Sequence, residues 1–302
     1  MCTAISYASR FFGRNLDVCT SYGEGVINLP SKYKLSYKKC GGDSCHYAII
    51  GIGSVRKGIP LFFDGANEKG LYMAALNFID NAVYHKSAPD FFNLTHYEII
   101  PFILSRCADV KEARGLLSKI NITDDTLDKD TPPAQLHWFI CDKKEAVTVE
   151  PMLDGLAVYD NPYGVLTNNP PFPFHLQNVK YHLHITKDEA KNGIAPEQSI
   201  KPTSYGLGGV GLPGDFSSHS RFLRTVFVKS SLLGKGVTDA IHVLQSAMQY
   251  RGCVKAGDSF QYTRYTAVFD SAEQAYYYNT YDDFTLRQRK IKLDGEMEFY
   301  PL

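Results

Sequence analysis

Short apolar segments bounded by glycine, proline, asparagine or aspartate recur along the chain, and their order constrains the fold more than any other feature. They predict strands in three groups, at 2–8, 47–53 and 71–78, at 135–141, 145–150, 156–160 and 163–168, and at 262–269, 274–280 and 284–290. Helical patterns lie between the groups. Blocks of strands with hairpin-like spacing, separated by helices, predict an α+β fold with antiparallel sheets.

The helical segments carry their own start signals. Pro101 suits the first position of a helix. Asp109 and Glu112 predict a capping box, and the apolar residues after it follow helical spacing. Two more helices are expected near 219–233 and 238–250, after a polar region with glycine and proline. Since no repeat or linker divides the chain, we expect a single domain of residues 1–302.

Charge and hydropathy exclude several classes of function. Lysine plus arginine and aspartate plus glutamate each number 32, so the chain lacks the basic footprint of a nucleic-acid binder. It also lacks a charge excess that would attract it to an anionic membrane surface. The sequence contains no window of 18 apolar residues, so it predicts no membrane span. The start of the chain has no basic segment followed by an apolar one, which predicts a cytoplasmic protein.

Cys2 is the first candidate catalytic residue, because it directly follows Met1. Removal of Met1 is expected, since the side chain after it is small. Cys2 would then carry both a thiol and a free α-amine, with ordinary pKa values of about 8.5 and about 7.7–8.0. Such an amine can act as a general base for the thiol. A Met-Cys start alone is weak support for this role.

Arg14 and Asp17 follow within one short motif, Phe-Gly-Arg-Asn-Leu-Asp. An arginine beside a thiol favours the thiolate, and a carboxylate can orient an α-ammonium group. The spacing of the two residues on its own is more typical of an ion pair at the surface.

Eight motifs in order along the chain resemble one known family, the choloylglycine hydrolases. They lie at residues 1–3, 13–17, 64–71, 75–78, 136–138, 165–170, 211–216 and 276–281. The family contains conjugated bile acid hydrolases and penicillin V acylases. The resemblance implies a four-layer αββα sandwich of the N-terminal-nucleophile type. It also implies an amidase without metal or organic cofactor, a homotetramer, and a bacterial, gut-associated source.

The resemblance also implies the roles of six residues. Cys2 falls on the nucleophile, Arg14 and Asp17 on the residues that surround it, and Asn77 and Asn168 on the oxyanion hole. A further arginine of the family falls on Arg221, and all six are expected to be catalytic.

Two features favour bile salts over penicillin V as the substrate. Asn77 stands where penicillin V acylases typically carry tyrosine, and Gly13 and Asn15 stand where they tend to carry alanine and threonine. Leu16 and Phe63 resemble the lining of the family's substrate pocket. An acylase for penicillin V or for N-acyl homoserine lactones, with the same mechanism, stays open as an alternative. A more remote one is a bile-acid-binding protein without turnover.

Two other patterns point to a cofactor or metal only superficially. Residues 206–211 match G-x-G-x-x-G, but proline and serine precede them where dinucleotide binding needs a strand. Cys40, Cys45 and His46 lie close together, but no second pair at zinc spacing accompanies them. We therefore expect neither a nucleotide nor a metal site.

Overall fold

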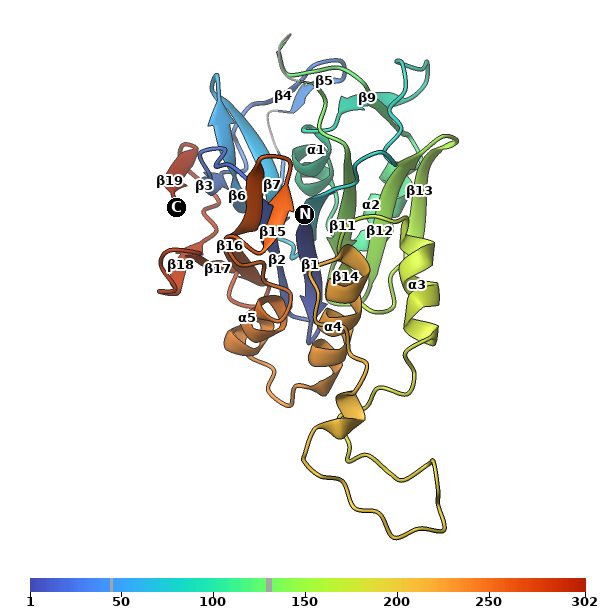
Figure 1. The fold of residues 1–302 in the computed structure, drawn as a ribbon. Coiled ribbons are helices and arrows are strands. Elements are labelled where there is room, and N and C mark those ends of the chain that lie inside the picture. The colour runs from blue at the N-terminus through green and yellow to red at the C-terminus, as the bar shows by residue number, and fades with distance from the viewer. Residues whose placement is uncertain (44–45, 129–131) are drawn as a thin grey trace.

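Two β-sheets form the centre of the molecule in a computed structural model that describes residues 1–43, 46–128 and 132–302 (Figure 1). In the first sheet the strands run in the order β14-β1-β2-β16-β17-β18, and β15 pairs with β16. Their bounds are β1 Cys2–Tyr7, β2 Phe11–Val18, β14 Val165–Leu166, β15 Val254–Ala256, β16 Ser259–Asp270, β17 Ala275–Thr280 and β18 Arg287–Lys290. All pairs are antiparallel, as the hairpin spacing predicts.

The second sheet has the order β13-β12-β11-β8-β7-β6-β3-β19. Its strands are β3 Gly25–Leu29, β6 Ile49–Arg56, β7 Ile59–Asn67, β8 Tyr72–Asn77, β11 Leu136–Cys141, β12 Ala146–Met152, β13 Gly155–Asp160 and β19 Glu298–Pro301. Two small sheets join β4 Leu35–Tyr37 with β5 Gly41–Asp43, and β9 Phe92–Thr95 with β10 Ile120–Thr123.

Helices cover the outer face of each sheet. The helices are α1 Ile99–Arg106, α2 Val110–Leu117, α3 Phe172–Lys180, α4 Ser218–Ser231 and α5 Val237–Gln245. Helices α4 and α5 pack on the first sheet, whereas α1 and α2 pack on the second. The layers therefore run helix, sheet, sheet, helix, which confirms the αββα sandwich (Figure 1).

Side-chain alternation in the second sheet explains how one layer serves two cores. Tyr72, Ala74 and Leu76 pack into the core between the sheets, whereas Met73 and Ala75 pack under α1 and α2. Successive side chains of a strand point to opposite faces, so a strand covered on both faces is apolar throughout.

Several local predictions need correction. Helix α1 begins at Ile99, which places Pro101 at its third position, where the N–H that proline lacks has no helical partner anyway. Asp109 caps α2 as predicted, but the Glu112 carboxylate accepts from the backbone N–H of Ala108 (2.7 Å) rather than of Asp109. The strand expected at 163–168 covers only Val165–Leu166, and the last helix ends at Gln245. Helix α3 was not predicted.

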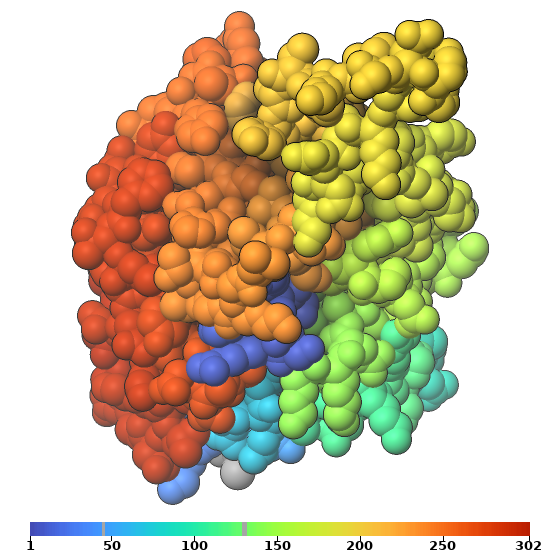
Figure 2. All heavy atoms as spheres, turned by 90° about the horizontal axis from the view of Figure 1, so that it is seen from below, coloured from blue at the N-terminus to red at the C-terminus, as the bar shows by residue number. Residues whose placement is uncertain are grey.

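Residues 181–217 form an arm that stands out from the sandwich (Figures 1 and 2). Within it the G-x-G-x-x-G segment forms a short 3-10 turn, Leu207–Gly209. No strand precedes this turn within the arm, all of which the structure describes, so the interpretation as a loop is confirmed. No helix in the described ranges is long and apolar enough to cross a membrane. The division of the chain into one domain stays a prediction.

Two glycine-to-alanine changes test the packing of the first sheet. A Cβ at Gly13 would lie 2.2 Å from the Ala267 carbonyl oxygen in the neighbouring strand. We expect Gly13→Ala to lower the free energy of unfolding by about 1–3 kcal/mol. Gly115 is exposed in α2 with open space around it, so Gly115→Ala should raise that free energy by about 0.5–1 kcal/mol. Denaturant titration measures both, and equal effects would contradict this packing.

Candidate active site

Cys2 begins β1 and lies buried between the two sheets, opposite Leu16 of β2. Arg14, also on β2, donates from Nη2 to the Cys2 sulfur at 2.6 Å. Its Nη1 donates to the carbonyl oxygens of Phe63 (2.9 Å) and Ala75 (2.8 Å), which belong to the second sheet. A fully buried guanidinium thus joins the sheets and the thiol.

Arg14 has its counter-charges nearby. Burial lowers the pKa of Arg14, but the negative charge available on Cys2, Tyr265 and Asp64 outweighs it and raises that pKa overall. Asp64 is itself buried and accepts hydrogen bonds from the hydroxyl groups of Tyr265 (2.6 Å), Tyr276 and Tyr72 (3.3 Å). Arg14 therefore keeps its positive charge beside the sulfur at any ordinary pH.

Asp17 follows on the same strand and is fully buried. Its Oδ1 accepts from the Thr263 hydroxyl at 2.7 Å, and Oδ2 lies 3.8 Å from Nη1 of Arg221. Burial raises the pKa of Asp17, and Arg221 opposes that rise. Among the described residues Oδ2 has no hydrogen-bond partner. Buried carboxylate oxygens rarely lack a hydrogen-bond partner, so Oδ2 of Asp17 is available to accept from a further donor.

Asn168 connects the remaining residues that the sequence singled out. Its Oδ1 accepts from the backbone N–H of Cys2 (2.7 Å) and from Nη2 of Arg221 (2.8 Å). Its Nδ2 donates to the Asn77 carbonyl oxygen at 2.8 Å. Arg221 also donates to the Cys2 carbonyl oxygen (2.6 Å). The six predicted catalytic residues thus form one connected group, drawn from β1, β2, β8, the segment after β14, and α4.

Met1 is present in this chain and blocks the Cys2 nitrogen as a peptide amide. The Met1 amine donates to the Asp17 carbonyl oxygen (2.6 Å) and to Oε1 of Gln261 (2.7 Å), and burial lowers its pKa. Loss of Met1 would place a new amine on Cys2, within the group formed by Asp17, Asn168 and Arg221.

A cavity of about 350 Å³ opens above the Cys2 sulfur. Leu16, Phe63 and Asn77 line it, as expected from the sequence. The other lining residues are mostly apolar: Val18, Tyr22, Ser54, Arg56, Leu61, Phe62, Ala75, His96, Tyr97, Leu127, Pro132, Ala134 and Leu136, together with Cys2 and Arg14. An apolar cavity with a nucleophile at its base fits a substrate with a large apolar acyl group.

Two buried histidines hold the backbone around Asn168, and sequence reasoning missed both. His175 Nε2 lies 2.9 Å from the Asn168 carbonyl oxygen, so this nitrogen must donate. His137 places Nε2 3.0 Å from the Thr167 carbonyl oxygen and Nδ1 3.2 Å from the Glu150 carboxylate. His137 lies in one of the eight motifs, and this position could have indicated that it supports the site. No spacing pattern marked His175, which lies on the unpredicted helix α3.

The cluster Cys40, Cys45 and His46 does not yield a metal site in the part that can be described. Cys45 lies outside the described residues. His46 places its ring nitrogens near the carbonyl oxygens of Tyr47 and Tyr33, and Cys40 donates to the Asn93 carbonyl oxygen.

Comparison with known proteins agrees with this geometry. The model of the linear amide C–N hydrolases, choloylglycine hydrolase family, matches residues 2–297. The chain belongs to the choloylglycine hydrolase family. A bile salt hydrolase/transferase of Lactiplantibacillus plantarum is 39% identical over 100% of this chain and 97% of its own length. A conjugated bile acid hydrolase of Lactobacillus gasseri is 35% identical over 98% and 97%.

Solved structures of family members share the fold. A conjugated bile acid hydrolase from Clostridium perfringens, in a mutant form, superposes with a TM-score of 0.92 at 30% identity and covers 100% of this chain and 97% of its own. A penicillin V acylase from Agrobacterium tumefaciens has a TM-score of 0.77 at 18% identity over 99% and 90%. The latter likeness concerns the fold alone.

The buried histidines predict an acid-sensitive fold. Burial lowers the pKa of His175 and of His96 from 6.5 to about 4. Between these values the unfolded chain binds protons that the folded chain does not, so the free energy of unfolding should fall as pH drops from about 6.5 to about 4. His175→Gln should remove about 3 kcal/mol of this loss. Denaturant titrations across this pH range measure it, with exposed His184→Gln as the control. If the free energy of unfolding of His175→Gln falls with pH as steeply as that of the unmodified chain, His175 is not the group responsible.

Proposed function

We propose that the chain hydrolyses the amide bond of glycine- and taurine-conjugated bile acids and releases the free bile acid and the amino acid. The observation that carries this proposal is the Cys2 thiol, held by the buried Arg14 at the base of an apolar cavity. Family members with these substrates in their names, matched over almost the whole chain, support it.

The first step needs a free amine on Cys2, which requires removal of Met1. The Cys2 α-amine takes the thiol proton, and the thiolate attacks the carbonyl carbon of the substrate amide. Arg14 stabilises the negative charge on sulfur. Asp17 holds the resulting ammonium group through Oδ2, the oxygen that has no partner among the described residues.

The tetrahedral intermediate carries its charge on the former carbonyl oxygen. The Asn168 side-chain amide has two N–H groups, of which one contacts the Asn77 carbonyl oxygen and the second can donate to this oxyanion. The backbone N–H of Asn77 supplies the other donor. The ammonium group protonates the leaving amine, the C–N bond breaks, and a thioester remains on Cys2. Water then attacks the thioester and restores the thiol. No metal or cofactor takes part.

Arg221 orients these groups without reaching the substrate. It donates to Asn168 Oδ1, the Cys2 carbonyl oxygen and the Thr3 hydroxyl, and it lies near Asp17. Leu16 and Phe63 contact the apolar part of the substrate in the cavity.

We also propose a homotetramer in the cytoplasm of a gut bacterium. The arm of residues 181–217 supports self-association, because it exposes Tyr181, Leu183, Ile194 and Tyr205 by 77–100% each. Exposed apolar side chains gathered on one projecting segment are typical of interaction surfaces. Light scattering of the purified protein measures its oligomeric state. A monomer at micromolar concentration would contradict the proposed homotetramer.

The substrate proposal is tested by amine release from taurocholate, glycocholate, penicillin V and an N-acyl homoserine lactone. We expect release from the two bile salts and at least a thousandfold loss in Cys2→Ala, which lacks the nucleophile. Turnover of penicillin V alone, or of the lactone alone, would be consistent with the proposed mechanism but would contradict the proposal that bile salts are the substrate. Binding of bile salts without turnover by the unmodified chain would instead favour a non-catalytic binding protein.

Processing of Met1 provides a second test. A chain that retains Met1 has no α-amine on Cys2, so we expect it to be inactive. Inserting a proline after the start, which Met-removing enzymes tolerate but which again blocks the Cys2 nitrogen, should also abolish activity. Intact mass identifies which form is present. Full activity in a population that carries only Met1-bearing chains would contradict the mechanism.

A further inference from the structure

The substrate cavity contains an arginine that the proposed mechanism does not use. Two of its lining residues carry a formal charge, Arg14 and Arg56, and none is an aspartate or glutamate. Arg14 already donates hydrogen bonds to the Cys2 sulfur and to two carbonyl oxygens. Across the described ranges, the Arg56 guanidinium makes neither a hydrogen bond nor an ion pair with another residue. An unpaired cation that lines an apolar cavity is a candidate for contact with the ligand.

Strand register places Arg56 at the end of the cavity far from the thiol. Arg56 pairs with Ile59, and Ser54 pairs with Leu61, in the β6–β7 hairpin. Directly opposite residues share a face of the sheet, so Arg56 follows Ser54 and Leu61 along the cavity wall. Phe63 marks the near end, because its carbonyl oxygen accepts from Arg14. From Phe63 to Ile59 the strand advances four residues, or about 13 Å.

This distance matches the shape of the proposed substrate. A conjugated bile acid carries its amide on a short side chain at one end of a rigid nucleus of four fused rings. With the amide carbonyl at Cys2, the last ring of the nucleus reaches the level of Arg56.

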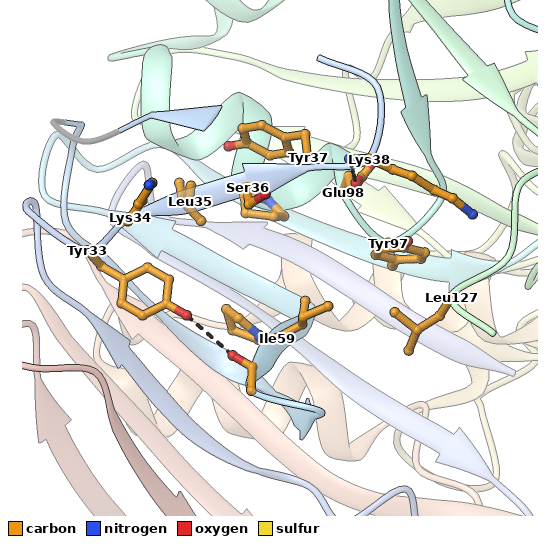
Figure 3. A pocket seen from close by; sticks show the side chains of 13 residues that line it. Tyr33, Lys34, Leu35, Ser36, Tyr37, Lys38, Ile59, Tyr97, Glu98 and Leu127 are labelled. Atoms are coloured by element: carbon orange, nitrogen blue, oxygen red, sulfur yellow. Dashed lines mark hydrogen bonds between the residues drawn. The ribbon is translucent and has the colours of Figure 1, made fainter. Parts of the chain in front are cut away.

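The cavity borders a second hollow of about 310 Å³ at this end, and Tyr97 and Leu127 line both (Figure 3). Lys34 adds positive charge at the rim of this second hollow. Within the described ranges Lys34 forms no ion pair. The one carboxylate of the hollow, Glu98, already accepts from the backbone N–H groups of Lys38 (2.6 Å) and Thr95 (2.8 Å). The far end of the cavity is thus open and positively charged.

We propose that Arg56 is a specificity residue, which binds an anionic substituent, a sulfate ester, on the ring of the steroid that lies farthest from the amide. The inference rests on the proposed function and names a subclass of its substrates. A guanidinium group donates two parallel hydrogen bonds to a sulfate, and such charge-assisted bonds are about twice as strong as neutral ones. The contact exists in the bound substrate and the transition state alike, so it should lower KM and leave kcat unchanged.

The test compares a taurine-conjugated steroid with and without a sulfate ester on the far ring. The measured quantity is the ratio of kcat/KM for the sulfated to that for the unsulfated compound. We expect Arg56→Gln to lower this ratio about tenfold through KM, and Arg56→Lys to restore part of it. Lys57→Gln removes the neighbouring charge at the hairpin tip and should leave the ratio unchanged, because Lys57 does not line the cavity.

Binding to Cys2→Ala protein separates this inference from the proposed function. Equilibrium affinities need no turnover, so they report on Arg56 even if the unmodified chain hydrolyses neither compound. We expect the sulfated compound to bind more tightly, with a preference that weakens as salt is added. An equal ratio in Arg56→Gln and the unmodified chain would overturn the inference. So would an equal rise in KM for both compounds, which would place Arg56 at the amino-acid end of the substrate.

Discussion

The buried Arg14 guanidinium is the interaction on which the site depends. It extends from β2 of the first sheet, contacts the Cys2 sulfur and ends on two carbonyl oxygens of the second sheet. A charge between two apolar sheets is costly unless every donor is paired. The Asp64 carboxylate with its three tyrosines supplies the compensating charge from behind. The same contacts therefore align the two sheets and define where the thiol lies.

A second buried network fixes the other side of the thiol. Arg221, Asn168 and Asp17 surround the Cys2 backbone, and His175 and His137 hold the peptide groups at Asn168. Nearly all donors and acceptors in this network are matched, which is expected for polar groups in a core. Among the described residues, Nδ1 of His175 and Oδ2 of Asp17 lack a hydrogen-bond partner. The Asp17 oxygen lies where removal of Met1 would supply an ammonium donor. The unprocessed chain thus has a site that is assembled but lacks its base.

Sequence patterns predicted the blocks of strands and helices, because apolar periodicity depends on burial of one or both faces. They did not predict α3 or the correct start of α1, since weak caps leave helix ends to tertiary packing. The pairing of the two sheets is a long-range property that local patterns do not contain. The resemblance to a family supplied the six site residues, whereas spacing alone gave only Cys2, Arg14 and Asp17 as candidates.

Residues outside the family motifs were the hardest to foresee. Thr263 acts on the site through a hydrogen bond to Asp17, which lies 246 residues away in the sequence, and no spacing rule covers such a distance. His175 lies only seven residues after its partner Asn168, but on a helix that the sequence patterns did not predict. Arg56 carries no signal in the sequence beyond its charge. Its position at the far end of the cavity follows only from the register of β6 with β7.

The central claim is that the Cys2 sulfur becomes acylated when its nitrogen is free. The most direct measurement is mass analysis of protein quenched in acid during turnover of a slowly hydrolysed conjugate. We expect a mass increase equal to the steroid acid minus water, located on the N-terminal peptide and confined to chains that have lost Met1. An adduct on another residue, or turnover with no adduct under conditions where water attack limits the rate, would contradict the account.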